Sequence, residues 1–590
     1  MDPELVTSLE VEAMVRRYLA KVARRYVPLV VALAVLLLVV TLVPSVSPKS
    51  QLANQTFAPN AAANNAGPGQ QAAANGATQT SGAALGGASA ALGGASSAVG
   101  SSGSSGSVSG AITTPPAAGT AGVTRSGVQC GAGVLQVTWS VYAPPCIPVF
   151  NGNNGGSTSF GVSKDTITAV FRRTSSVEEK AAYAAVGKAA PGTDDQWLAD
   201  LRMYANFFNK TYELYGRQLA IKDFTGQGDN LQEDQGQDLE GAAADAATAH
   251  DKGAFVDLTQ SPTLASTQPY DEDLAQQHVV VVGGLGLPRS WFAQRAPWEY
   301  SATPDGTKGA QGAVNALCAR SVGLPAIYAG DSLYQHQTRT FGLVTPDNDV
   351  YKALGDQIQQ GLQQQCGGVI SKRISYAINI ATMPQQSVNI VGQLHAAGIT
   401  TVLCVCDPVV EIPISDTASG QAYNPEWLAV PWLDPQGREV NQSEWSHAVS
   451  GEGTWPGKAT SEAWRVWRLA AAAAGTPNAV PQEQYYAVGY FYLSYVFNQL
   501  QRAGPNLNPN TFQQAAFTMP QTATGDVGTW GGGGQAFTPN LDAQVGYWDP
   551  NSVSNFDGTK GAWISCESGK WFTYASNNFG PRQQFHCFGH

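Results

Sequence analysis

Charged side chains are scarce in this sequence. Only 13% of the 590 residues are Asp, Glu, Lys or Arg, and the formal net charge is −11. Since no basic stripe is present to neutralise phosphates, a nucleic-acid-binding protein is excluded. The sequence also lacks G-x-S-x-G, H-E-x-x-H, P-loop and Rossmann glycine motifs, and its seven His residues are scattered. We therefore expect no catalysis, no cofactor and no metal site.

Long apolar runs are absent except near the N-terminus. Residues 27–44 read VPLVVALAVLLLVVTLVP and carry no charge. At 1.5 Å per residue the run is about 27 Å long, enough to cross the hydrocarbon core of a bilayer. Five basic residues precede the run and only Lys49 follows it closely, so the positive-inside rule keeps residues 1–26 in the cytoplasm. The sequence thus predicts a single-pass membrane anchor at 27–45 with the main domain extracytoplasmic, and cleavage after the run is the alternative.

Aromatic and charged residues almost disappear between residues 46 and 126. This stretch is built from Ala, Gly, Ser, Asn, Gln, Thr and Pro. Because such a composition buries too little apolar surface to offset the entropy of ordering, it predicts a disordered linker. The linker joins the anchor to residues 127–590, and a simple cell-wall spacer would have the same sequence.

The cysteine count is even, at eight. In an extracytoplasmic chain this favours disulfides, although sequence alone leaves the pairing open. Three pairs are suggested by proximity or by neighbouring helices: Cys130 with Cys146, Cys318 with Cys366, and Cys566 with Cys587. Cys404 and Cys406 face the same side of a predicted strand, so a metal or redox role there is an alternative to a structural one.

Strands and helices alternate after residue 155. The first set has strands predicted at 159–173, 218–224, 254–260 and 277–288, with helices at 194–215 and 240–253. The second set has strands predicted at 339–347, 373–379 and 399–408, with helices at 309–323, 349–368 and 384–398. This rhythm predicts an α/β fold of two doubly wound parallel-sheet lobes with a hinge. We assign residues 155–305 and 460–540 to lobe 1, and residues 306–459 and 541–590 to lobe 2.

Several stretches, taken in order, carry a family resemblance. They are GVSKDTITAVF (161–171), FNKTYELYGRQLAIKDFTGQGD (208–229), AFVDLTQSPTLAST (254–267), VVVVGGLGLP (279–288), YYAVGYFYLSYVFNQLQRAG (485–504) and NPNTFQQAAF (508–517). Over residues 155–590 the chain resembles the type I periplasmic-binding-protein fold, in particular the branched-chain amino-acid (Leu/Ile/Val) substrate-binding proteins of ABC transporters. The resemblance implies ligand binding in a cleft between two lobes, beyond the carboxyl ends of their strands.

The candidate ligand-binding residues follow from strand ends and from this resemblance. They are Arg172, Arg173, Ser261, Thr263, Gly284, Leu285, Gly286, Tyr351 and Asp407. The two arginines end the first strand, where they would grip a carboxylate or form an ion pair. The glycine turn would offer backbone N–H groups or simply be a tight turn. Arginine replaces the family's small residues after the first strand, and Asp407 is the only counterpart found for its ammonium-binding acid, so the resemblance carries amino-acid specificity only weakly.

The sequence therefore predicts a membrane-tethered, extracytoplasmic solute-binding protein. By resemblance it captures a small polar solute, such as an amino acid or amide, and presents it to an ABC transporter permease. The alternative is the ectodomain of a ligand-sensing receptor, or a surface scaffold protein that has kept the fold and lost its ligand.

Overall fold

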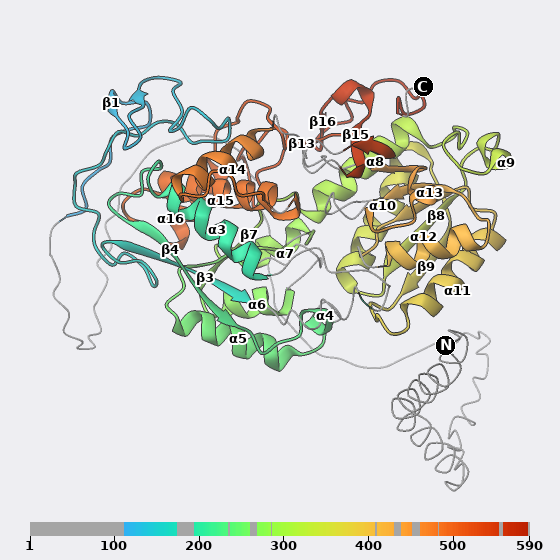
Figure 1. Cartoon of the computed structure of the whole chain (residues 1–590), viewed down its shortest axis with the longest axis horizontal. Coiled ribbons are helices and arrows are strands. Elements are labelled where there is room, and N and C mark those ends of the chain that lie inside the picture. The colour runs from blue at the N-terminus through green and yellow to red at the C-terminus, as the bar shows by residue number, and fades with distance from the viewer. Residues whose placement is uncertain are drawn as a thin grey trace, which may run out of the picture. The chain divides into compact units, whose positions relative to one another are not determined.

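The computed structural model describes part of the chain: residues 111–173, 184, 194–233, 236–259, 268–284, 286–407, 410–429, 438–450, 461–481, 483–553 and 559–587 (Figure 1). Contacts divide the chain into residues 1–102 and 103–590, and every described residue belongs to the second part. The predicted cytoplasmic segment, anchor and linker up to residue 110 lie outside the described residues. None of the helices in these ranges is long and apolar enough to span a bilayer.

Lobe 1 is built on a five-stranded sheet in which every pair of neighbours is parallel. The strand order is β4-β3-β5-β6-β7. The strands are β3 (Thr166–Arg173), β4 (Gln218–Thr225), β5 (Val256–Asp257), β6 (Val280–Val282) and β7 (Glu299–Tyr300). The helices are α3 (Asp194–Phe208), α4 (Asn230–Glu233), α5 (Leu239–Asp251), α6 (Gln268–Gln276), α7 (Arg289–Gln294), α14 (Glu462–Ala473), α15 (Glu483–Ala503) and α16 (Pro509–Phe517).

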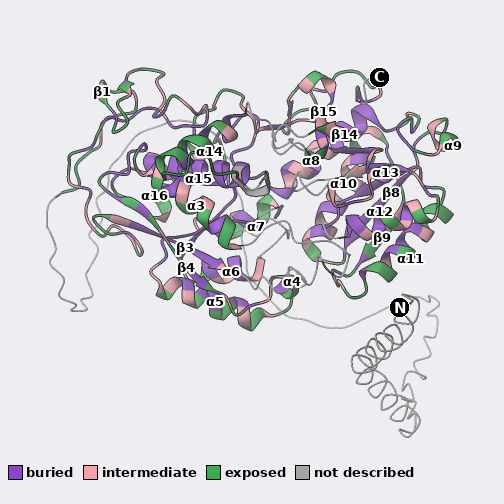
Figure 2. Cartoon of the chain, in the orientation of Figure 1, coloured by how far each residue is buried: buried purple, intermediate pink, exposed green. Residues whose placement is uncertain are grey.

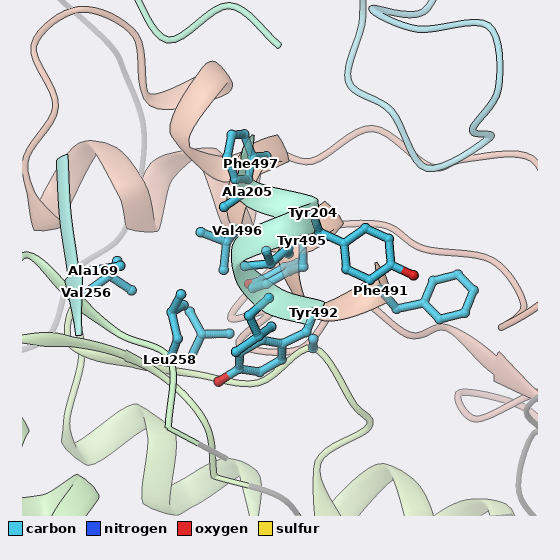
Figure 3. Packing of buried hydrophobic residues seen from close by; sticks show 14 of the residues in the cluster. Ala169, Tyr204, Ala205, Val256, Leu258, Phe491, Tyr492, Tyr495, Val496 and Phe497 are labelled. Carbon is cyan, nitrogen blue, oxygen red and sulfur yellow. The ribbon is translucent and has the colours of Figure 1, made fainter. Parts of the chain in front are cut away.

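Helices cover both faces of this sheet, and its inner strands β3, β5 and β6 are buried along most of their length. Alternate residues of β3 enter different clusters: Ala169 and Phe171 pack with α3, α14, α15 and α16, whereas Val170 packs with α5 and α6. Figure 3 shows the first cluster, with Tyr204 of α3 and Tyr492 and Val496 of α15 gathered over the strands. The edge strand β4 is the exception, with four of its eight residues exposed (Figure 2).

Lobe 2 repeats the plan on a seven-stranded sheet. The order is β15-β14-β12-β11-β10-β8-β9, with β8 to β12 parallel and the last two strands antiparallel. The strands are β8 (Phe341–Pro346), β9 (Ile370–Tyr376), β10 (Thr401–Cys404), β11 (Glu426–Ala429), β12 (Ala448–Ser450), β14 (Gly546–Val553) and β15 (Lys560–Ser565). The helices are α8 (Gly306–Arg320), α9 (Ser332–Gln335), α10 (Asp349–Cys366), α11 (Met383–Ala396), α12 (Glu411–Gly420) and α13 (Gln442–Trp445).

The same alternation places helices on both faces of the second sheet. Val344 and Val402 pack with α11 and α12, while Leu343 and Leu403 pack with α8 and α10. The prediction of an α/β fold with two parallel-sheet lobes is thus confirmed. Each lobe has the doubly wound order in which the first strand lies between the second and the third.

Two of the passages between the lobes lie side by side. The chain runs from β7 into α8, and it returns from α16 through a short antiparallel pair, β13 (Asp542–Ala543) with β16 (Phe572–Thr573). The Ser301 N–H donates to Phe537 O (3.1 Å), and Lys308 Nζ donates to the carbonyls of Thr538 (2.8 Å) and Asn540 (2.7 Å). We call this contact between the two passages the joint.

The residues that precede lobe 1 are ordered, which differs from the prediction of a linker reaching residue 126. We call residues 111–158 the arm. Within it β1 (Gly122–Val123) pairs antiparallel with β2 (Gln129–Cys130), and the Cys130–Cys146 disulfide closes a loop. Ser140 Oγ donates to Glu462 Oε1 of lobe 1 (2.7 Å), and the Tyr142 hydroxyl donates to Gly528 O (2.9 Å). The order therefore comes from a cross-link and from tertiary contacts, which composition does not reveal.

Four disulfides account for all eight cysteines. They are Cys130–Cys146, Cys318–Cys366, Cys404–Cys406 and Cys566–Cys587. The three pairings that the sequence suggests are present. Cys404 and Cys406 bond to each other, and no group of three or more His, Cys, Asp or Glu in the described ranges is arranged to hold a metal ion.

Candidate functional site

The strand order locates the candidate site in each lobe. In a doubly wound sheet the loops diverge between the first and third strands, so a crevice opens outside their carboxyl ends. These strands are β3 and β5 in lobe 1, and β8 and β10 in lobe 2. Residues that follow these four strands are therefore the candidates for contact with a ligand.

In lobe 1 this position holds a buried ion-pair cluster. The Arg172 side chain is fully buried at the end of β3, and its Nη1 and Nη2 donate to Glu233 Oε2 (3.0 Å) and Oε1 (2.5 Å). Its Nε lies 2.8 Å from Asp245 Oδ2. Burial raises the pKa of Glu233, and the hydrogen bonds from Arg172 offset part of that rise. Arg172 is thus already held by two carboxylates of its own lobe.

A second layer of hydrogen bonds fixes the loop after β5. Asp257 accepts the N–H of Thr259 (2.7 Å) and the hydroxyl proton of Tyr270 (2.9 Å). The Arg172 N–H in turn donates to Thr259 Oγ1 (2.8 Å), and the Arg172 guanidinium lies 4.5 Å from the centre of the Tyr270 ring. Burial raises the pKa of Asp257 from 3.8 to about 6, against the opposing effect of these hydrogen bonds.

The corresponding position in lobe 2 carries a smaller cluster. Asp407 follows β10 and the Cys404–Cys406 disulfide; its Oδ2 accepts the hydroxyl of Tyr376 (2.5 Å), which itself accepts the Asp407 N–H (3.0 Å). Glu411 begins α12 one turn later, and burial, followed by the charge of Asp407, raises its pKa well above the ordinary value. Asp407 and Tyr376 are buried and bonded to each other, so this cluster, like that of lobe 1, is held within its own lobe.

A cavity of about 640 Å³ lies where loops of the two lobes meet. Lobe 1 contributes residues around α4, α5 and α6, and lobe 2 contributes the loop between β8 and α10. We call it the cleft cavity; its lining is Glu233, Gly236, Leu239, Ala243, Gln268, Pro269, Glu272, Asp273, Asp347, Asn348 and Asp349. Five of these side chains are carboxylates and none is basic.

Three cations pair with the carboxylates of this wall. Arg172 pairs with Glu233, and Arg295 lies 2.5 Å from Glu272. Lys352 lies 3.2 Å from Asp347 and 3.1 Å from Asp349. Asp273 has no ion pair among the described residues, and burial and then the charge of Glu272 raise its pKa. The wall therefore has an excess of negative charge, which favours a ligand that carries a positive group.

The residues predicted to bind a ligand lie in different places in the structure. None of the predicted residues that the structure describes lines the cleft cavity. Arg173 is half-exposed and pairs with Asp195 (3.0 Å) and Asp223 (2.9 Å). Gly284 and Gly286 form a turn with positive φ, and the Gly284 N–H donates to Asp271 Oδ2 (3.2 Å). Tyr351 packs in the α8–α10 core, Arg172 and Asp407 lie in the clusters above, and Ser261, Thr263 and Leu285 lie outside the described residues.

The residues that do line the cleft cavity are not among those predicted from the sequence. Asp347 ends the predicted strand 339–347 in lobe 2, and Asn348 and Asp349 directly follow it, so the rule of strand carboxyl ends could have identified them. Asn348 also caps α10, its Oδ1 accepting the Val350 N–H (2.9 Å). Glu233, Glu272 and Asp273 carry no comparable signal, because they come from short helices whose position depends on packing.

Comparisons with known proteins concern the fold only. No protein-family model and no curated protein matches the chain. Among solved structures, it is similar to a substrate-binding periplasmic protein from Ralstonia solanacearum (14% identity, 67% of this chain and 99% of that chain, TM-score 0.47). It is also similar to a leucine-, isoleucine-, valine-, threonine- and alanine-binding protein from Brucella ovis (13% identity, 70% and 97%, TM-score 0.48). A third is a fatty acid ABC transporter substrate-binding protein from Thermomonospora curvata (12% identity, 70% and 94%, TM-score 0.49).

These neighbours have the type I substrate-binding fold, as the sequence resemblance implies. Their printed ligands differ from one another, from amino acids to a fatty acid. At such identities and scores the likeness carries no argument about what this chain binds. That question depends on the residues of the chain itself.

Proposed function

We propose that this protein is an extracytoplasmic solute-binding protein that captures a small polar solute between its two lobes and presents it to an ABC transporter permease. The observation that supports this most directly is the cleft cavity, which is lined from the carboxyl-end loops of both doubly wound sheets. Its volume, about 640 Å³, lies in the range of small-molecule sites. Residues of both lobes would touch the same solute, so binding would favour the closed arrangement.

The wall of the cleft cavity supports a solute with an amino group, such as an amino acid or a related amide. Five carboxylates attract an ammonium group, while Leu239, which is 58% exposed, offers an apolar contact for an aliphatic part. A solute with only a carboxylate would meet like charges on both sides. Cationic and zwitterionic solutes are therefore expected to bind before anionic ones.

The membrane tether is part of the proposal. The uncharged run at 27–44, with basic residues before it, supports an anchor whose N-terminus is cytoplasmic. The four disulfides support an oxidising environment for the described part of the chain.

Thermal unfolding with a panel of solutes tests the binding function. The panel contains amino acids, diamines, amides, sugars and aromatic acids, added to a chain that begins at Gly103. A solute that binds only the folded state stabilises it by about 2.7 kcal/mol at a hundredfold excess over Kd. We expect one class with an amino group to raise the melting temperature reproducibly. The double substitution Asp347→Asn and Asp349→Asn should reduce that shift, whereas Asp356→Asn, on α10 but outside the cleft cavity, should leave it unchanged.

A second function, that of a receptor ectodomain or scaffold without a captured solute, is favoured by one observation. Arg172, at the end of the first strand, is fully buried and bound by Glu233 and Asp245, so it is not available to a ligand. A flat response to every solute in the panel would support this function and contradict solute capture.

A further inference from the structure

A second cavity, of about 740 Å³, lies beside the joint. Its walls come from the start of α7, from α8, from the C-terminal end of α10, and from the loops 532–541 and 574–577. We call it the α8 cavity. It shares no lining residue with the cleft cavity, and no motif of the sequence analysis falls on it.

Amide side chains form an ordered row along one wall of the α8 cavity. Gln311 Nε2 and Gln365 Nε2 both donate to Asn315 Oδ1, each at 3.0 Å, and Asn315 Nδ2 donates to Tyr574 O (3.4 Å). The Asn315 Oδ1 is thereby satisfied and Asn315 is buried, whereas Gln311 and Gln365 are exposed. Each presents an amide that both donates and accepts, which suits hydroxyl groups.

Asn540 lines the α8 cavity from the opposite passage of the joint. It is 6% exposed, and its Oδ1 has no hydrogen-bond partner in the described part of the chain. Buried polar atoms without partners are rare because they are unfavourable. A hydroxyl donor held in this cavity is a partner that an amide at this position can accept.

The charge of the α8 cavity is opposite to that of the cleft cavity. No carboxylate is among the described residues that line it, and its cations are Arg289 and Lys308. Lys308 Nζ donates hydrogen bonds to Thr538 O, Thr538 Oγ1 and Asn540 O, at 2.7 to 2.9 Å, which uses all three of its N–H groups. The Arg289 side chain is 46% exposed, and its ion-pair contact is a long one, 3.6 Å to Asp305 Oδ2. Arg289 therefore has N–H groups that can form a bidentate ion pair with a carboxylate.

We propose that the α8 cavity binds a small hydroxylated carboxylate, of the sugar-acid class. The carboxylate pairs with Arg289, and the hydroxyl groups bond to Gln311, Gln365 and Asn540. Leu541, Ala536 and the Tyr574 ring, which passes so close to Gly312 that a Cβ there would lie 3.1 Å from it, supply apolar surface for the carbon skeleton. The site lies against the Lys308 hydrogen bonds that hold the two passages together, apart from the site of solute capture.

Calorimetric titration of the full chain in detergent with D-galacturonate and D-gluconate tests this site. D-glucose, which lacks the carboxylate, and hexanoate, which lacks the hydroxyls, are the comparators. We expect saturable binding of one sugar acid per chain, at least tenfold tighter than either comparator. Arg289→Gln should weaken it at least tenfold, and Arg582→Gln, at an exposed arginine outside the cavity, should not change it.

The variants also separate this proposal from solute capture. The double substitution Asp347→Asn and Asp349→Asn should leave sugar-acid binding intact; its loss there would place the ligand in the cleft cavity and overturn the proposal. Absence of saturable binding, or binding that survives both Arg289→Gln and Gln365→Leu, would also overturn it. Gln365 is exposed, so its substitution reports on the site even if the arginine variant fails to fold.

Discussion

Several carboxyl groups are buried around Arg172 in lobe 1, more than its single positive charge can neutralise. Glu233, Asp245 and Asp257 lie around it, and Glu299 of β7 is buried nearby with neither carboxylate oxygen hydrogen-bonded within the described ranges. Burial, and then the charge of Asp271, raises the pKa of Glu299 well above its ordinary value. Protonation, and not only ion pairing, therefore reduces the negative charge of these buried carboxyl groups.

Replacing Asp257 with Asn should change how stability depends on pH. The folded-state pKa is about 6, raised from 3.8, so the folded state binds the proton more tightly than the unfolded state. The contribution of Asp257 to stability is therefore complete below pH 4 and is lost as pH rises through 6. Relative to Asp257→Asn, the natural chain should lose on the order of 3 kcal/mol between pH 4 and pH 7. Chemical denaturation at four pH values measures the difference.

Glu299→Gln is a second probe of the same effect. Burial raises the pKa of Glu299 well above its ordinary value, so the folded chain binds this proton more tightly than the unfolded chain does. The natural chain should therefore lose stability relative to Glu299→Gln as the pH rises above 4.5, the ordinary pKa of the group. Parallel curves for the Asp257→Asn variant and the natural chain would contradict the buried, proton-binding environment of Asp257.

For single residues, the sequence predicted the position on a strand or helix better than the interaction partner. Arg172 could be located at the end of a strand from the pattern TITAVF alone. Its partners could not, because Glu233 follows the next strand and Asp245 lies inside the helix after that, and only the packing of α4 and α5 decides which acid reaches it. The disulfide pairs were easier, because cysteines near in the chain or on adjacent helices have few alternatives.

The disulfides differ in what they join. Cys318–Cys366 links the C-terminal turns of α8 and α10, and Cys130–Cys146 closes a loop inside the arm. Cys404–Cys406 spans two residues at the end of β10 and cross-links no separate elements. In the chain-entropy account, stabilisation grows with the length of the loop that is closed.

Removing one disulfide at a time, by replacing both of its cysteines with serine, should therefore rank the three disulfides by their contribution to stability. The loops are 48 residues for Cys318–Cys366, 16 for Cys130–Cys146 and 2 for Cys404–Cys406. We expect losses of about 4, about 3 and about 1 kcal/mol in the free energy of unfolding. Equilibrium denaturation of the three double variants measures them. A larger loss for the Cys404 pair than for the Cys318 pair would show that the short ring does more than limit the unfolded chain.

Elements buried on both sides were predictable, and those at the lobe margins were not. The strands that became β3, β8 and β10 stand out as apolar runs between amphipathic helices, because helices cover both faces of each sheet. The edge strand β4 was predicted as well, although half of its residues are exposed. β5 and β6 are shorter than the predicted 254–260 and 277–288, since the chain leaves the ladder where the loops of the site begin. The antiparallel strands β14 and β15 went unpredicted, and β14 contains Pro550 and half-exposed residues typical of a sheet edge.

For the whole molecule, the proposed tether predicts where the protein is found. The full chain should fractionate with membranes, resist a high-salt wash and be released by detergent, while a variant without residues 27–45 should be soluble. Protease added to intact cells should remove the part of the chain described here, because the positive-inside rule places it outside. A mature protein whose measured mass corresponds to a chain starting after residue 45 would contradict the anchor and support cleavage.

The arm gives the molecule a mechanical polarity. Any pull transmitted along the N-terminal segment reaches residues 111–158 first, and from there it passes through the Glu462 and Gly528 contacts into one lobe. The Cys130–Cys146 bond is covalent, so the arm cannot be peeled through that loop while the bond lasts. Lobe 2 follows lobe 1 through the passages between them, and Val350 of α10 packs against the core of lobe 1. Under tension along the N-terminal segment, the arm and lobe 1 would take up the force before it reaches lobe 2.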